Sequence, residues 1–474
     1  MKRGDLIKFF SCIMLAMMSA CVKYHPQPIS PSQTASSFES RTLDNPSLKE
    51  FIEANLHHEV TPWPPKSWDF TMLTLVAFYY HPDLDVARAR WGVTQAGIIT
   101  AGRRPNPSVG FIPQYDVDAL SGISPWIFNF TLDIPIETAG KRGYRITQAT
   151  QLSEAVHLSI AIVAWQVRSR LRTGLLNLYA AEQTMVILEK MLTVQEEIVK
   201  LLEKRLDIGE VSQPDVTQAH ISLNQARLSL HQAQKQRAEA CVQLATALGL
   251  PVNALEGTEI SSAFSEHLPT EVSSPDLRRQ ALISRPDILS SLAEYAASQT
   301  ALQLEVAKQY PDLQLGPGYQ YDQGEDKWSL GFSVTLPVLN RNEGPIAEAE
   351  ARRIEAQARF TALQARVISE IDQAQAGYPA ALQNLETANI LLVSQEKHLQ
   401  SVQEMFNIGE ADRLALLHAQ LELETTALSR LDTFVKAQQS LGSLEDALQR
   451  PLGSVDSFPM IPEANPRVKE EDTR

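Results

Sequence analysis

The chain of 474 residues is poor in the residue types that build metal sites and disulfide frameworks. Its three cysteines, Cys12, Cys21 and Cys241, are too few and too far apart for a zinc site or a disulfide-stapled domain. Its 10 histidines are scattered, apart from His57-His58, which has no further ligand types close by in the sequence. We therefore expect neither a bound metal nor a cofactor.

Positive charge is outnumbered by negative charge, and sequence motifs of common enzyme active sites are absent. The formal net charge is −14 at pH 7, which argues against nucleic-acid binding, because nucleic-acid binders carry a basic stripe. Zincin, nucleophile-elbow and P-loop motifs are absent, since Gly140-Lys141 lacks an upstream glycine and is followed by Arg142. We expect no enzymatic activity, so any energy for transport must come from a partner.

Apolar runs are short throughout the chain, and none reaches the ~20 residues of a membrane helix. Residues 1–20 are typical of a signal peptide, with a basic start and a brief apolar run from Phe9 to Met18. Met18-Ser19-Ala20-Cys21 resembles a bacterial lipobox, in which Cys21 becomes the lipidated first residue; ordinary signal cleavage is the alternative. Residues 21–46 are rich in Pro and Ser, which predicts an extended, lipidated tether.

The chain then repeats itself, with an offset that drifts from 204 to 200 residues. His81-Pro82-Asp83 recurs as Arg285-Pro286-Asp287, and Ile208-Gly209-Glu210 recurs as Ile408-Gly409-Glu410. Hydrophobic residues spaced by seven predict long, left-handed coiled helices in both copies. In the first copy they are Leu171, Leu178, Met185, Leu192, Val199 and Leu206, and at +200 they are Ile371, Tyr378, Leu385, Leu392, Leu399 and Phe406.

Each repeat predicts the same order: a helix, two strands, a very long helix, a turn and a last helix. Repeat 1 covers 47–250, with a helix at 72–103, strands at about 107–117 and 126–135, a long helix at 141–207 and a turn at about 208–214. Repeat 2 covers 279–450, with a helix at 279–309, strands at about 312–321 and 328–337, a long helix at 345–407 and a turn at about 408–412. Residues 251–278 link the repeats, and 451–474 form a C-terminal tail. We name the two turns the first tip and the second tip.

Helix lengths predict a tall cylinder of paired helices, because a 67-residue helix spans ~100 Å and two shorter helices stacked end to end match it. The strands alternate apolar and polar residues over the ~9–11 positions that a tilted membrane strand needs. A half-buried soluble sheet has the same period and is the alternative. Four strands cannot close a barrel, so we expect each protomer to donate its four strands to a shared one. Four aromatic residues are expected at the membrane interface: Tyr115, Trp126, Tyr319 and Trp328.

The duplication, the lipobox and the first tip together resemble the TolC family of outer membrane factors. The residues that match the family's tip pattern are Arg205, Gly209, Ser212, Asp215 and Val216. The second tip keeps Gly409 and Asp412 but has Met405 where the family has Arg or Tyr. The resemblance implies a mainly α protein with a β membrane part: a periplasmic α-barrel of a homotrimer below a shared transmembrane β-barrel in the outer membrane.

The resemblance also implies partners: a periplasmic adaptor protein at the tips and an inner-membrane pump, with the RND type favoured. The stretch from Pro135 to Gly143 is similar to the heavy-metal efflux branch. The expected function is a passive exit duct, and a structural coiled-coil lipoprotein of the periplasm is the alternative. We expect Glu410 and Asp412 to repel one another and attract cations at the entrance, or else to be solvated surface charges. The residues expected to dock the adaptor are Arg205, Leu206, Gly209, Val211, Ser212, Asp215, Phe406, Gly409 and Leu414.

Overall fold

The structure is a computed structural model that describes residues 24–261, 268–269 and 275–452. It divides into two compact units, Met1–Thr42 and Leu43–Arg474. In the first unit, α2 (Pro31–Glu39) is helical, so the expectation of a fully extended tether over 21–46 was wrong for these nine residues. Pro31 occupies the first helical turn, where a missing N–H costs nothing, and the Thr34 hydroxyl donates to the Pro31 carbonyl.

The second unit begins with α3 (Pro46–Leu56) and α4 (Phe70–Tyr80), which lie in its largest hydrophobic core. From Leu73 to Tyr80 every residue of α4 is buried. A two-stranded parallel ladder, β1 (Ser67–Trp68) with β4 (Glu259–Ile260), joins this region to the segment after repeat 1. A short 3₁₀ turn, Val252–Leu255, precedes β4.

The sequence predicts a single helix before each strand pair, whereas the structure has two helices in each of these places. In repeat 1, α4 ends at Tyr80 and α5 runs over Pro82–Gly102; in repeat 2, α8 (Pro275–Ser284) is followed by α9 (Pro286–Ala307). His81 and Arg285 stand between them with extended backbone, at ψ of 123° and 130°. The cause is the proline that follows each of them, which disfavours helical backbone in the preceding residue.

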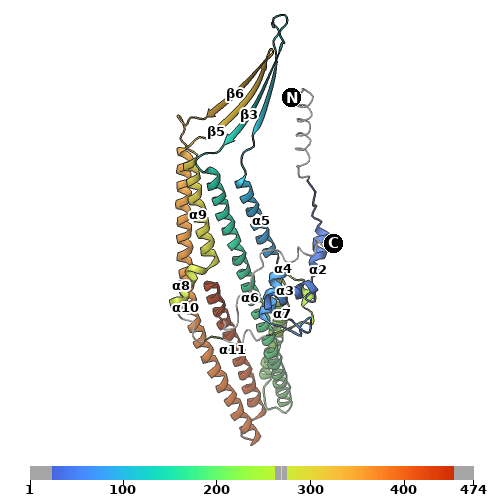
Figure 1. The fold of residues 1–474 in the computed structure, drawn as a ribbon. Coiled ribbons are helices and arrows are strands. Elements are labelled where there is room, and N and C mark those ends of the chain that lie inside the picture. The colour runs from blue at the N-terminus through green and yellow to red at the C-terminus, as the bar shows by residue number, and fades with distance from the viewer. Residues whose placement is uncertain (1–23, 262–267, 270–274, 453–474) are drawn as a thin grey trace. The chain divides into compact units, whose positions relative to one another are not determined.

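The unit also contains two helical hairpins (Figure 1). In repeat 1, α6 (Lys141–Asp207) turns at the first tip into α7 (Gln213–Leu248); in repeat 2, α10 (Glu343–Asn407) turns at the second tip into α11 (Arg413–Leu448). The prediction of two very long helices is confirmed, at 67 and 65 residues. Heptad positions are buried against neighbouring helices: Leu171, Leu178, Val199, Ile371, Tyr378 and Leu385.

A four-stranded antiparallel sheet, in the order β2-β3-β5-β6, unites the strands of both repeats. Its strands are β2 (Ser108–Tyr115), β3 (Trp126–Ile136), β5 (Leu313–Asp322) and β6 (Glu325–Val334). The chain enters the sheet after α5 and α9 and leaves it into α6 and α10, so the sheet and the tips lie at opposite ends of the long helices. Within the described residues, no helix has the length and apolarity to cross a membrane.

Candidate functional site

The sheet has one apolar face and one mainly polar face, as its register determines. Phe111 pairs with Phe130, Phe130 with Tyr319 and Tyr319 with Trp328, so these four rings lie on the same face across all four strands. Neighbouring strand positions on that face add Val109, Trp126, Phe128, Leu132, Leu315, Leu330 and Phe332. The opposite face carries mostly small and polar residues, among them Asn129, Thr131, Asp133, Gln314, Gln320, Ser329 and Ser333.

The apolar face is exposed, and the outer edges of β2 and β6 have no strand beside them in the described part of the chain. Trp328 is 81% exposed and Phe332 is 76% exposed. A soluble sheet buries such a face against a core, and an open edge beside it invites pairing with another chain. In one protomer, therefore, both the apolar face and the two outer edges of the sheet remain uncovered.

The four predicted interface aromatics fall into two pairs at different levels of the sheet. Tyr115 is the register partner of Trp126, and Tyr319 is the register partner of Trp328, with ring centroids 5.0 and 4.9 Å apart. Tyr319 also aligns with Phe130 on β3, four residues along the strand from Trp126. The two pairs thus differ in height by about 13 Å, at ~3.3 Å per residue.

The stretch from Pro135 to Gly143 forms the joint between β3 and α6, and it ties the two repeats together. The Lys141 ammonium donates to the Tyr310 carbonyl at 2.6 Å and to the Asp312 carboxylate at 2.7 Å. Thr138 donates its N–H to Asp312 and its hydroxyl to the Pro311 carbonyl. Lys141 is buried and Asp312 is exposed, and their ion pair joins the entry of β5 to the start of α6.

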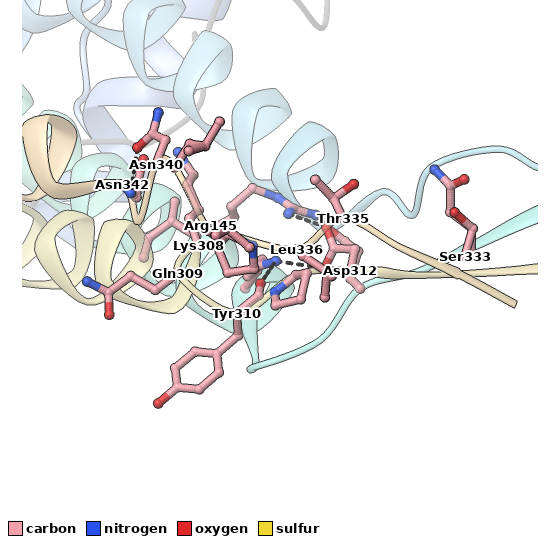
Figure 2. Close-up of a pocket in the computed structure, with 18 residues that line it drawn as sticks. Arg145, Lys308, Gln309, Tyr310, Asp312, Ser333, Thr335, Leu336, Asn340 and Asn342 are labelled. Atoms are coloured by element: carbon pink, nitrogen blue, oxygen red, sulfur yellow. Dashed lines mark hydrogen bonds and ion pairs between the residues drawn. The ribbon is translucent and has the colours of Figure 1, made fainter.

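A cavity of about 970 Å³ lies at this joint (Figure 2). Asp312 and Arg145 lie on its wall with their hydrogen bonds drawn, whereas the Tyr310 ring points away from it. Arg145 makes a two-pronged ion pair with Glu137 and donates to the carbonyls of Ala101 and Arg103, where α5 ends. The stretch therefore has a structural role: Thr138 and Lys141 tie the joint to the start of β5, and Glu137 holds the arginine that reaches the end of α5.

Both tips reverse the chain through a glycine with left-handed backbone, Gly209 at φ +76° and Gly409 at φ +82°. Ser212 is the N-cap of α7, and the Asp215 carboxylate accepts hydrogen bonds from both the N–H and the hydroxyl of Ser212. Asp412 caps α11 by accepting the Ala415 N–H at 2.8 Å. Glycine permits φ > 0 without strain. Asp412 satisfies a free N–H in the first turn of α11, and Asp215 satisfies the N–H of the N-cap residue of α7.

Arg205 joins the two tips. Its guanidinium lies 2.8 Å from the Asp412 carboxylate and 3.9 Å from that of Glu210. The Ala415 N–H and then Arg205 hold the pKa of Asp412 below its usual range. Asp412 thus has an ion-pair partner within the same chain, although both it and Glu410, the other candidate gate residue, are exposed.

The four large apolar residues predicted to dock the adaptor are half-buried within the protomer. The half-buried Leu206, Val211 and Leu414 pack against one hydrophobic cluster near the tips, and Phe406 packs against another. The apolar side chains that do project from the tips are Ile208, 70% exposed, and Ile408, 72% exposed. They were not among the predicted docking residues, although each stands directly before the tip glycine in its repeat.

A buried charge cluster between α6 and α11 has no signal in the sequence motifs. The Glu445 carboxylate accepts from Arg168 at 3.0 Å and from Arg172, and Asp446 accepts from Arg172 at 3.3 Å. Arg168 is 4% exposed and Glu445 is 6% exposed, and burial lowers the pKa of Arg172. The sequence shows only two arginines, four residues apart, on the long helix of repeat 1.

These features agree with a known family. The sequence profile of outer membrane efflux proteins matches residues 78–250 and 277–453, one match for each repeat. This chain belongs to the outer membrane efflux protein family. The resemblance to the TolC family noted in the sequence is thereby confirmed, and the protein is an efflux channel component of the outer membrane.

Relatives with established names are distant but extensive. The cobalt-zinc-cadmium resistance protein CzcC of Cupriavidus metallidurans is 23% identical over 377 residues, which are 78% of this chain and 87% of CzcC. The pyoverdine export outer membrane protein OpmQ of Pseudomonas aeruginosa is 23% identical over 348 residues, 71% of each chain. Members of this family are channel proteins, in keeping with the expectation of no catalytic chemistry.

Solved structures establish the fold. CusC superposes with a TM-score of 0.65 at 19% identity, over 82% of this chain and 95% of CusC. VceC of Vibrio cholerae superposes with a TM-score of 0.64 at 21% identity, over 81% of this chain and 97% of VceC. The predicted fold class, a long helical part with a smaller β part, is confirmed.

Two expected features concern what the chain binds. Among the described residues, no group of three or more His, Cys, Asp or Glu side chains is placed to hold a metal ion. The predicted lipidation site, Cys21, lies outside the described residues.

Proposed function

We propose that three copies of this chain form one channel, the exit duct of a tripartite efflux system that runs from a periplasmic adaptor to the cell exterior. The sheet carries the proposal: it has an exposed apolar face, a polar face and two open edges, at one end of helices that are ~100 Å long. Pairing β6 of one copy with β2 of the next would close twelve strands, with the apolar face toward lipid and the polar face toward a water-filled bore.

The opposite end of the helices then faces the inner membrane. Ile208 and Ile408 project there beside the tip glycines, which supports docking of a periplasmic adaptor against exposed apolar groups. An inner-membrane pump, with the RND type favoured, supplies the energy. Lipidation of Cys21 adds an anchor in the outer membrane, with most of the mass of each protomer in the periplasm.

Assembly can be tested directly. The protein extracted in mild detergent is expected to be a trimer by light scattering that accounts for bound detergent. A folded, membrane-inserted monomer would contradict the proposal, because four strands leave unpaired backbone groups in lipid.

The names of the relatives supply candidate cargoes, which can be tested one by one. The name of CzcC makes cobalt, zinc and cadmium the first candidates, and that of OpmQ makes pyoverdine the second. A strain that lacks this chain is expected to accumulate the transported cargo, and re-expression is expected to reverse this. Sensitivity to all three metals that stays unchanged on deletion would remove metals from consideration.

A further inference from the structure

The polar face of the sheet carries four charged side chains in each copy. Three of them, Asp322, Glu325 and Lys327, lie together at the β5–β6 turn, where the Lys327 ammonium is 2.6 Å from Asp322 and 3.5 Å from Glu325. The fourth, Asp133, lies on β3 opposite Ser108 of β2. Among the described residues, its carboxylate has neither a hydrogen-bond partner nor an ion-pair partner. Asp133 therefore stands apart from the charges at the turn.

The strands beside Asp133 leave its carboxylate uncovered on the polar face. The β3–β5 register places Gly316 at the same level, and Gly316 pairs with Gly331 on β6. Neither glycine has a side chain that could cover or bind the carboxylate. Lys327 aligns with Asn129, four residues from Asp133, so ~13 Å of strand separates the two levels. This exceeds the ~8 Å over which salt screens charges at physiological ionic strength.

At the helix end of the sheet, the cations that follow Asp133 along the chain have other partners. Lys141 contacts Asp312, Arg145 contacts Glu137, and Arg142 donates to the Gly102 carbonyl. The charge of Asp133 is thus not balanced by these cations of its own chain. A carboxylate without a counter-charge requires water, so Asp133 agrees with a water-filled bore on the polar side of the sheet.

The proposed trimer would turn this single residue into a ring. Twelve strands ~4.8 Å apart and tilted by ~40° close a barrel with a backbone radius of about 12 Å, so inward-facing carboxylates lie roughly 8 Å from its axis. Repeat 2 has Thr335 at the position that corresponds to Asp133, so each copy contributes one carboxylate. Such a ring attracts cations and repels anions that pass along the axis.

We infer that Asp133 is a selectivity-determining residue of this channel and that its ring makes the barrel favour cationic over anionic cargo. The inference rests on the proposed trimeric channel, and among the candidate cargoes it favours metal cations. Reversal potentials in planar bilayers under a salt gradient measure the ratio of cation to anion permeability. Asp133→Asn keeps the shape of the side chain and is expected to lower this ratio roughly tenfold in 0.01 M salt but less than about twofold in 1 M salt, because the Debye length falls from ~30 Å to ~3 Å. Asp133→Lys is expected to lower the ratio further.

Asp118→Asn is the matched control, because it removes the same charge from the exposed loop between β2 and β3. It is expected to change the permeability ratio by less than about twofold in either salt. Equal ratios for the wild type and Asp133→Asn in 0.01 M salt would overturn the inference.

A second measurement tests which face of the sheet lines the bore. In a Cys241→Ser background, Asp133→Cys is expected to react with a charged, membrane-impermeant methanethiosulfonate, whereas Leu132→Cys on the apolar face is protected by lipid. A reactive Asp133→Cys together with unchanged selectivity in Asp133→Asn would overturn the inference and leave the proposed channel standing. Reaction of Leu132→Cys alone would instead place the apolar face in the bore and remove the proposed function.

Discussion

Glu445 provides the most quantitative prediction, because its carboxylate is the shared counter-charge of two buried arginines. Glu445→Ala removes the group that Arg168 contacts at 3.0 Å, while Arg172 keeps Asp446 at 3.3 Å. Breaking a buried ion pair by removing one partner costs about 3–5 kcal/mol. The cation–π contacts of Arg168 with two rings, centred at 4.8 and 5.0 Å, persist in the variant. We therefore expect Glu445→Ala to lower the free energy of unfolding by the lower end of this range, about 3 kcal/mol.

The measurement is unfolding of the detergent-purified protein across a urea series, followed by tryptophan fluorescence and by protease resistance. The Trp165 indole donates to Asp446 at 2.9 Å, so one of the six tryptophans lies at the cluster itself. Glu386→Ala, which removes an exposed carboxylate from a long helix, is the matched control and is expected to change stability by about 0.5 kcal/mol at most.

A second variant separates charge from packing. Arg168→Met combined with Glu445→Leu removes the charge pair instead of leaving one charge unmatched, so it is expected to be more stable than Glu445→Leu alone. Equal midpoints for Glu445→Ala and Glu386→Ala would refute the reasoning, since the cluster would then contribute no more than a surface charge.

Four further predictions concern the anchor and the tips. Cys21→Ala is expected to abolish acylation, and a lipid-free mature N-terminus of the wild-type protein in mass spectrometry would disprove the anchor. Gly409→Trp is expected to leave oligomer and membrane insertion intact but to remove efflux: nothing lies within 4 Å of an added Cβ, so the strain is confined to a turn at φ +82°. Glu410→Ala with Asp412→Ala is expected to change single-channel conductance or cation selectivity in planar bilayers; an unchanged channel would make both acids ordinary surface charges. The pKa of Asp412 is lowered in the folded state, so its tie to Arg205 is present above the ordinary carboxyl range and is lost as pH falls through the lowered value. The contribution of this tie to conductance should accordingly be lost only when the pH falls below the ordinary aspartate range.

Much of the architecture follows from local sequence pattern. The heptads that run through Leu171 and Ile371 predict the two long helices, because side chains seven apart must face the same neighbour. The alternation from Trp126 to Leu132 predicts a strand with unlike faces, because successive side chains point to opposite sides. The tip glycines mark the reversals, since their backbone is left-handed.

Contacts between distant segments were decided by tertiary structure alone. The sequence displays Lys141 and Asp312 as unrelated charges 171 residues apart, yet the sheet order β3-β5 brings them to 2.7 Å. Arg168 and Glu445 meet only because α6 packs against α11, and no periodicity of either helix specifies that pairing. Likewise, Leu206 and Ile208 look alike in the sequence, but the packing of the hairpins covers the first and leaves the second in solvent.

The sequence by itself determined the duplication, the kind of each element and the family, because repeat offsets, heptads and tip motifs are properties of short segments. The tertiary structure decided which charges are paired, which apolar residues remain exposed and which edges of the sheet are open. Those properties depend on long-range packing: a side chain is buried or paired according to the helix or strand that lies beside it, and that neighbour can be 277 residues away, as for Arg168 and Glu445.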